Sequence, residues 1–170
     1  LLVLLFALSV AGCGGVDVRQ YAAEQPALEL SDYFNGELEA WGMFQNRSGE
    51  VVKRFHVAMT GTWQGDVGTL DERFTYSDGS TERRVWTLRR QADGSWRGTA
   101  GDVVGEAIGE VSGNALHWRY QLLLKVDGEQ YVVDFDDWMF LMDQRVMLNR
   151  ARMSKWGIDL GQVTLSFYKP

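Results

Sequence analysis

Three Asp-Gly pairs divide most of the chain into short β-rich segments. They are Asp78-Gly79, Asp93-Gly94 and Asp127-Gly128. Asp-Gly between such segments predicts a β-hairpin, because a type I′ turn needs two residues that tolerate a positive φ. Weaker turn signals such as NRSG (46–49) and MDQR (142–145) lie between the other segments. The chain is therefore expected to fold as a series of hairpins.

The spacing of these turns predicts nine or ten strands, and no segment between them keeps the 3.6-residue period of a helix. A run of sequential hairpins favours an all-β, antiparallel up-and-down barrel of roughly 8–10 strands, lipocalin-like, because closure removes exposed strand edges. A two-sheet β-sandwich is the alternative. The expected strand ranges are 36–45, 50–62, 67–77, 80–91, 95–100, 104–112, 114–126, 129–141, 146–156 and 161–168.

Length and charge limit the classes of function. The 170 residues suffice for one domain with a core, and 45% of them are hydrophobic. The net charge of −6 argues against a nucleic-acid partner, since phosphate binding needs a basic surface. With two histidines and one cysteine, the sequence contains no closely spaced metal-ligand motif and no nucleophile motif. We expect no metal and no cofactor.

The first residues resemble the end of a bacterial lipoprotein signal peptide. The run LLVLLFALSVAGC is uncharged and apolar, and its last four residues, Val10 to Cys13, resemble a lipobox, in which the cysteine receives lipid. We therefore interpret residues 1–12 as a partial signal peptide and residues 13–32 as the lipidated Cys13 with a tether. Residues 33–170 form the single β-barrel domain in this interpretation.

The lipobox resemblance implies a location in the bacterial envelope. Acyl chains on Cys13 would hold the protein on a membrane. Gly14 follows the cysteine, where an aspartate would favour retention in the inner membrane. We therefore expect a lipid anchor in the outer membrane of a Gram-negative bacterium, with the domain on the periplasmic face. Inner-membrane retention is the alternative.

The clearest strand, 114–126, predicts the register of one hairpin. A two-residue turn at Asp127-Gly128 places Trp118 opposite Asp137 and Tyr120 opposite Phe135. The apolar faces of the two strands then agree, which supports this register.

The next turn predicts which charged residues accompany that apolar face. Centred on Asp143-Gln144, it places Asp137 opposite Arg150 and Phe135 opposite Arg152. Asp134 and Asp136 point to the opposite face, because successive side chains of a strand alternate. The acidic stretch DFDDWMFLMDQ (134–144) is thus not expected to converge on one metal ion.

These registers define a candidate ligand-binding set on the interior face: Trp118, Tyr120, Phe135, Asp137, Met139, Arg150 and Arg152. Three roles are open for its charged members: a structural ion pair, an anchor for the head group of an amphipathic ligand, or catalysis. The faces of strands 67–77 and 80–91 stay unassigned, because the Asp78-Gly79 register puts Trp86 and Leu88 on the side opposite Leu70 and Phe74. A bulge, or burial of both faces, would resolve this conflict.

Several segments together resemble a bacterial family of putative lipoproteins, the domain of unknown function 3833. They are YFNGELEAWG, QGDVGTLDERFTYSDGSTERRVWTL, GEVSGNALHWRYQL, VDGEQYVVDFDDWMFLMD and NRARMSKWGIDLGQVTL. The resemblance runs from Tyr33 almost to the C-terminus. It implies a lipidated envelope protein with a lipocalin-like barrel and no established activity. Members of this family tend to be encoded near enzymes that modify membrane fatty acids.

Barrel and anchor together favour a protein that binds or shuttles a hydrophobic or lipid ligand, such as a fatty acid or phospholipid derivative. Two alternatives are open. One is an envelope enzyme that acts on lipid through Asp137 and Arg150. The other is an envelope scaffold with a filled barrel and no ligand.

Overall fold

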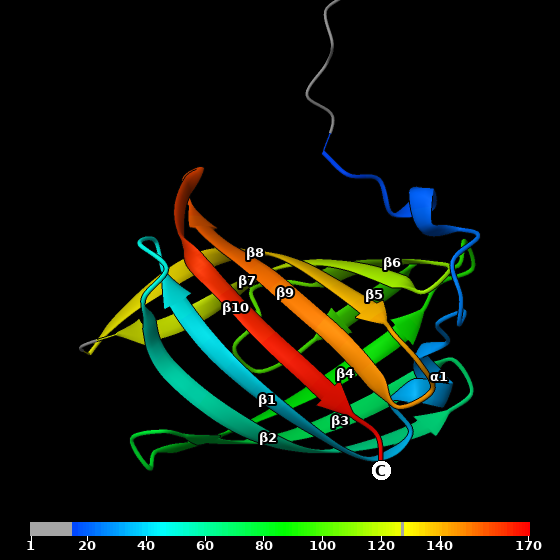
Figure 1. Cartoon of the computed structure of the whole chain (residues 1–170), viewed down its shortest axis with the longest axis horizontal. Coiled ribbons are helices and arrows are strands. Elements are labelled where there is room, and N and C mark those ends of the chain that lie inside the picture. Colours follow the sequence, from blue (N-terminus) through cyan, green and yellow to red (C-terminus); the bar gives the residue numbers. More distant parts are fainter. Residues whose placement is uncertain (1–14, 127) are drawn as a thin grey trace, which may run out of the picture.

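The computed structural model describes residues 15–126 and 128–170 and consists almost entirely of antiparallel strands (Figure 1). The interpretations of residues 1–12 and of Cys13 lie outside the described residues. Two short helices, η1 (Val18–Tyr21) and α1 (Leu30–Tyr33), precede the strands. The strands are β1 (Gly36–Asn46), β2 (Val51–Gln64), β3 (Val67–Tyr76), β4 (Thr81–Arg90), β5 (Trp96–Thr99), β6 (Ala107–Ser112), β7 (Ala115–Val126), β8 (Glu129–Leu141), β9 (Val146–Lys155) and β10 (Ile158–Tyr168).

The ten strands close into one barrel. Each strand pairs with its neighbours in sequence, and β1 pairs with β10 to complete the ring, with Ala40 opposite Phe167 (Figure 1). Closure removes the two free edges of an open sheet, although β5 pairs with β4 only over Thr87–Arg90 and β6 pairs with β7 only over Ala115–Arg119. The predicted all-β, up-and-down antiparallel barrel is confirmed, and the sandwich alternative is wrong. Within the described residues, none of the helices has the length and apolar character needed to span a membrane.

The hairpin of β7 and β8 has the predicted register. Trp118 lies opposite Asp137, and Tyr120 lies opposite Phe135. Strands of 12 and 13 residues with matching apolar faces leave little choice of pairing.

The hairpin of β3 and β4 differs from a two-residue type I′ turn. The N–H of Tyr76 donates to the carbonyl of Ser80 at 2.9 Å, and Gly79 has a φ of 83°. The loop therefore holds three residues, as in a type I turn followed by a glycine bulge. This shift places Leu70 opposite Trp86 and Glu72 opposite Arg84, all on the interior face. It resolves the conflict between the faces of these strands.

The hairpin of β8 and β9 has a similar extra residue, and here our predicted register is wrong. Met142 N–H donates to the Val146 carbonyl at 2.9 Å, and the Asp143 carboxylate accepts from the backbone N–H groups of Arg145 and Val146. Asp137 consequently lies opposite Ala151 and not opposite Arg150. A slip of one residue moves every side chain of a strand to the other face.

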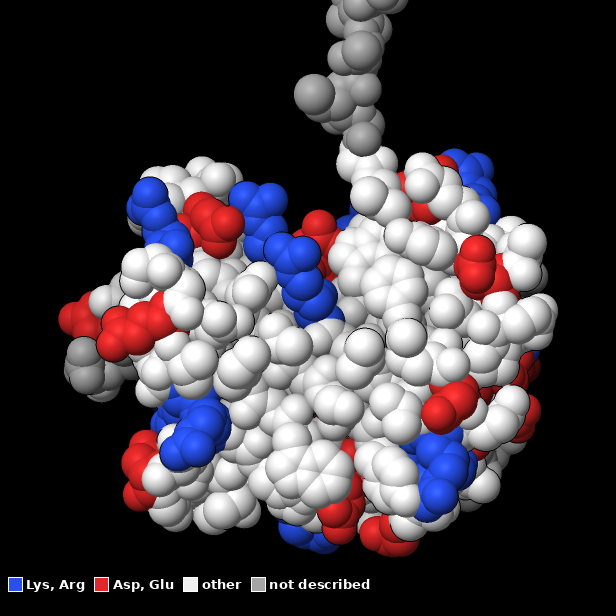
Figure 2. All heavy atoms as spheres, in the orientation of Figure 1, with Lys and Arg blue, Asp and Glu red and all other residues white. Residues whose placement is uncertain are grey.

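Arg150 and Arg152 therefore lie on the outer surface, which corrects their assignment to the interior. Arg150 Nε donates to Gln162 at 3.0 Å, and Arg152 Nε lies 3.2 Å from Asp159 with 60% of its side chain exposed. On the face shown in Figure 2, such basic side chains are interspersed with acidic ones and form no continuous basic area.

The chain before β1 closes one end of the barrel. Leu30 of α1 is 1% exposed, and Phe34, which follows the helix, is 4% exposed. Upstream, the N–H of Leu28 donates to the carbonyl of Gly113 at 2.8 Å, and Val18 is buried. Apolar side chains of the segment 13–32 thus pack against the barrel from Val18 onward.

The closed half of the barrel is filled by large side chains. The ring of Trp118 lies against Gly98 of β5 and Gly109 of β6, where any Cβ atom would overlap it. Met59, Leu88 and other buried residues complete this core around the base formed by Leu30 and Phe34.

Candidate functional site

The barrel contains a cavity with a volume of about 1170 Å³. Its walls extend from Leu30 and Phe34 at the closed end to Lys125, Tyr131 and Lys155 beside the hairpins of the opposite end. Lys125 and Tyr131 are exposed, so the cavity reaches solvent at that end, which we call the mouth.

One wall of the cavity is apolar and is formed by strands of the second half of the chain together with β1. Its inward side chains come from alternate positions, as the two-residue period of a strand requires. Because these side chains surround an open space, they present a hydrophobic surface to a ligand. The wall consists of Leu122, Val133, Phe135, Ala151 and Met153, with Phe44, Leu124, Leu160 and Val163 packed beside them.

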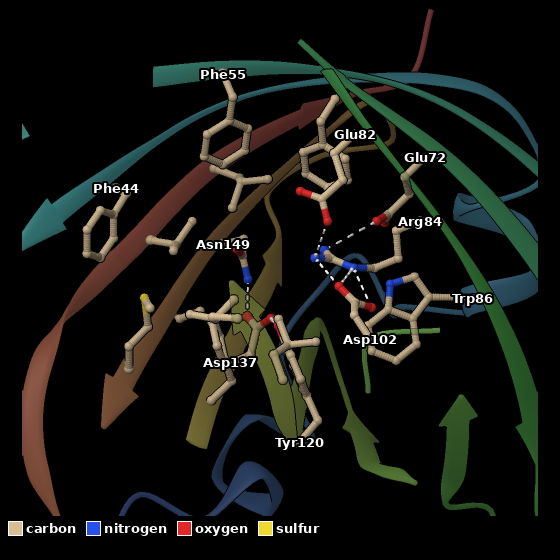
Figure 3. A pocket seen from close by; sticks show the side chains of 18 of the residues that line it. Phe44, Phe55, Glu72, Glu82, Arg84, Trp86, Asp102, Tyr120, Asp137 and Asn149 are labelled. Atoms are coloured by element: carbon tan, nitrogen blue, oxygen red, sulfur yellow. Dashed lines mark hydrogen bonds and ion pairs between the residues drawn. The ribbon is translucent and has the colours of Figure 1, made fainter. Parts of the chain in front are cut away.

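The opposite wall carries a buried guanidinium group among carboxylates (Figure 3). Arg84 of β4 contacts Asp102 through Nη2 at 2.7 Å and through Nε at 2.9 Å. Its guanidinium also lies 3.7 Å from Glu82 and 3.9 Å from Glu72. The Arg84 side chain is 15% exposed, and that of Glu72 is 12% exposed.

The loop between β5 and β6 delivers Asp102 to this cluster. The N–H of Leu123 donates to the carbonyl of Asp102 at 2.8 Å, and the N–H of Val104 donates to the carbonyl of Gln121 at 2.9 Å. These bonds attach the loop to β7. The Asp102 side chain lies directly beside the Arg84 guanidinium (Figure 3).

Asp137 forms a second polar group in the same cavity (Figure 3). Its carboxyl group accepts hydrogen bonds from the Tyr120 hydroxyl at 3.3 Å and from Asn149 Nδ2. Asn149 also donates to the carbonyl of Trp138 at 3.2 Å, which orients the amide. Asp137 and Asn149 are each 4% exposed.

Burial shifts the ionisation of these carboxyl groups. It raises the pKa of Asp137 to about 7, against the opposing effect of the hydrogen bonds from Asn149 and Tyr120. Burial likewise raises the pKa of Glu72 to about 7, although the Arg84 charge opposes the shift. Burial disfavours the charged form of Arg84, but Asp102 and Glu72 together raise its pKa above the ordinary value. Near neutrality the cavity thus holds a permanent cation, Arg84, and two carboxyl groups, each of which is partly protonated.

The structure brings together five of the seven residues of the candidate set. Trp118, Tyr120, Phe135, Asp137 and Met139 all line the cavity. Arg150 and Arg152 do not line it, because the extra residue of the β8–β9 turn places both on the outer face.

The polar residues of the cavity that sequence reasoning missed include Glu72, Arg84, Asp102 and Asn149. A three-residue loop at 77–79 would have placed Glu72 opposite Arg84, and one at 143–145 would have placed Asn149 on the face of Asp137. Nothing in the sequence around Asp102 indicates that its side chain meets Arg84.

The outer face of β8 carries the other two carboxylates of the DFDD stretch. Asp136 lies 2.6 Å from His117 Nε2, and Asp134 accepts from Gln121 Nε2 at 2.7 Å. Across the described parts of the chain, no three His, Cys, Asp or Glu side chains are grouped so that they could hold a metal ion.

Comparison with known families gives a match over nearly the whole chain. The sequence model of DUF3833, described as a protein of unknown function, matches residues 7–169. The chain belongs to the DUF3833 family. This confirms the resemblance seen in the sequence segments and extends it to both ends of the barrel domain.

Among solved structures, this DUF3833 protein is similar to a protein with unknown function from the DUF3598 family of Nostoc punctiforme PCC 73102. The two share 12% sequence identity with a TM-score of 0.52, and the similarity covers 87% of this chain and 51% of the other. The chain thus spans about half the length of that neighbour, and the likeness concerns the fold alone. A search of curated proteins finds no match.

Proposed function

We propose that the barrel binds a hydrophobic or amphipathic ligand of the lipid class in its interior and carries it within the bacterial envelope. The cavity supports this proposal. Its volume of about 1170 Å³ lies slightly above the usual range of roughly 300–1,000 Å³ for small-molecule sites, and one wall is a cluster of apolar side chains. Apolar surface facing an open interior is covered favourably by an apolar ligand, because contact with water costs roughly 25 cal/mol per Å².

The alternatives have less support. A scaffold with a filled interior does not need an open cavity reaching from the mouth to Asp137. An enzyme acting through Asp137 and Arg150 would need both groups at one site, and Arg150 lies on the outer face of β9.

Side chains at the mouth are of the types that favour a lipid–water interface. Trp156, in the turn between β9 and β10, is 85% exposed and has a φ of 52°, which is unusual for a bulky residue. The Lys155 ammonium lies 4.7 Å from the Trp156 ring centre and 4.5 Å from that of Tyr131. Aromatic and lysine side chains combine an apolar body with a polar end.

The cavity proposal is tested by filling the apolar wall. Ala151 is 2% exposed and lines the cavity, so Ala151→Trp would place an indole in the space of the ligand. We expect at least about a tenfold loss of affinity for the neutral dye N-phenylnaphthylamine, measured by its fluorescence, because the site is occluded. The matched control is Ala58→Trp on the exposed outer face of β2, which should bind like the unmodified chain. A folded Ala151→Trp variant with undiminished dye binding would contradict the proposal.

We also propose that Cys13 carries the lipid anchor and that the domain faces the periplasm from the outer membrane. The lipobox-like Val10 to Cys13 and the following Gly14 support this. Mass spectrometry of the N-terminal peptide from bacterial membranes is expected to find acyl chains on Cys13, and Cys13→Ala should release the protein from the membrane fraction. Unmodified Cys13 in a membrane-bound protein would exclude this anchor.

A further inference from the structure

The charges inside the cavity are unevenly placed. Four carboxyl groups line it, from Glu72, Glu82, Asp102 and Asp137, whereas Arg84 is the one guanidinium among the lining residues that the structure describes. Glu82 is partly exposed and accepts from the Tyr76 hydroxyl at 2.7 Å. The other three carboxyl groups lie deeper or face Arg84. The interior is thus rich in hydrogen-bond acceptors.

Arg84 is already engaged by the protein. Its Nε and Nη2 groups bind the same carboxylate, that of Asp102, at 2.9 and 2.7 Å. A ligand anion that took these donors would leave Asp102 without its partner inside the barrel. A carboxylate in that position is costly, because desolvation is no longer offset by the ion pair. Through Nε and Nη2, Arg84 is therefore a poor receptor for a ligand carboxylate or phosphate.

Three lysines line the cavity near its mouth, Lys53, Lys125 and Lys155, and two of them contact neighbouring side chains. Lys53 Nζ lies 3.1 Å from Asp78 and 4.2 Å from the Tyr76 ring centre. Lys155 lies between the rings of Tyr131 and Trp156. These groups face water, which weakens their attraction for an anion. They do not neutralise the carboxyl groups in the interior.

We propose that the cavity selects a long-chain amphiphile whose polar group donates hydrogen bonds and carries no negative charge, with Asp137 and Glu72 as the acceptors. This inference rests on the proposed function, because it names the class of ligand that the same cavity holds. Asp137 accepts two hydrogen bonds and has room in its lone pairs for more. Glu72 lies 3.9 Å from Arg84, which leaves it free to accept from a closer donor. A hydroxyl or an ammonium group meets both requirements.

The experiment uses the full chain at about pH 8. Four ligands of equal chain length compete with the dye N-phenylnaphthylamine for the cavity. Hexadecanol and hexadecylamine present a neutral and a cationic donor, whereas palmitate and hexadecanesulfonate present anions. We expect the two donors to displace the dye at concentrations at least about tenfold lower than the two anions. Preference for the alcohol or for the amine identifies which donor the site takes.

Variants that remove the carboxyl groups test whether Asp137 and Glu72 cause the preference for hydrogen-bond donors over anions. Asp137→Asn combined with Glu72→Gln keeps the size of both side chains, and we expect the preference over the anions to fall below about threefold. Each single variant is measured as well, in case the double variant does not fold. The control is Asp134→Asn on the outer face of β8, which should leave the preference unchanged.

The outcomes separate this inference from the proposed function. If the unmodified chain binds the dye but binds the anions as tightly as the donors, or more tightly, this inference is overturned and the proposal of a lipid-binding cavity stands. Unchanged preference in folded Asp137 and Glu72 variants overturns the assignment of the acceptors. Failure of the dye and of all four amphiphiles to bind overturns both proposals.

Discussion

Arg84→Met is expected to lower the free energy of unfolding by about 3–5 kcal/mol at neutral to mildly alkaline pH. The substitution keeps much of the side-chain volume but removes the cation that contacts Asp102, Glu72 and Glu82. Three carboxylates would then face one another across a partly dry interior. Removing one partner of a buried ion pair costs more than the pair contributes, because an uncompensated charge stays behind.

The loss should depend on pH in a defined direction. Burial raises the pKa of Glu72 from 4.5 to about 7 in the folded protein, so its contribution to stability is complete below about pH 4.5 and is lost as the pH rises towards 7. The Arg84 charge opposes this shift. Without it the pKa of Glu72 rises further, and the deficit of the variant grows from mildly acidic to alkaline pH.

Urea unfolding at several pH values between about 5 and 8 measures this effect. The matched control is Arg83→Met, the neighbouring arginine on the outer face, whose side chain is 62% exposed and binds Asp71 at 2.8 Å. It should change stability far less, because water replaces its contacts. Equal losses for the two variants, or a deficit for Arg84→Met that shrinks as the pH rises, would contradict the role assigned to the buried guanidinium.

Gly61→Ala is expected to cost at least about 3 kcal/mol of stability, because its Cβ atom cannot be accommodated. The position lies in β2 opposite Gly36 and Leu70, where the added atom would overlap the backbone carbonyl of Phe34. A backbone atom cannot rotate away as a side chain can. The segment that closes the barrel would have to move off its end and expose Leu30 and Phe34.

Thermal unfolding and limited proteolysis between residues 20 and 35 report this displacement. Gly101→Ala serves as the control, since nothing lies within 4 Å of its added Cβ atom. We expect the control to be as stable as the unmodified chain and equally resistant in that segment. Unaltered stability of Gly61→Ala would show that the closing segment does not depend on this contact.

The hairpin registers show where sequence reasoning succeeds. For β7 and β8, long alternating strands around Asp127-Gly128 led to the observed pairing of Trp118 with Asp137. For β3 and β4, the same dipeptide type occurs within a three-residue loop, and Gly79 supplies the positive φ of its bulge. Asp-Gly suits both kinds of turn, so the dipeptide alone does not decide the faces of the strands that follow.

The residues of the candidate site likewise fall into those that the sequence placed correctly and those that depended on the turns. The aromatic residues Trp118, Tyr120 and Phe135 were placed correctly because their strand pattern is unambiguous. Arg150 was placed inside and Asn149 was overlooked, since these neighbours exchange faces when the β8–β9 loop gains one residue. The pairing of Arg84 with Asp102 joins strand β4 to the loop between β5 and β6, and no local pattern encodes it.

The sequence by itself determined the number and order of the strands, the up-and-down connection and the family, because hairpin signals and alternating apolar residues are local. The tertiary structure alone decided that Arg84 and Asp102 meet in the cavity, that Arg150 lies outside, and that the segment before β1 closes one end. Asp-Gly is compatible with both two- and three-residue turns, and the choice between them depends on which register buries the apolar faces of the whole barrel. That choice placed Arg84 and Asn149 in the cavity and Arg150 on the outer surface.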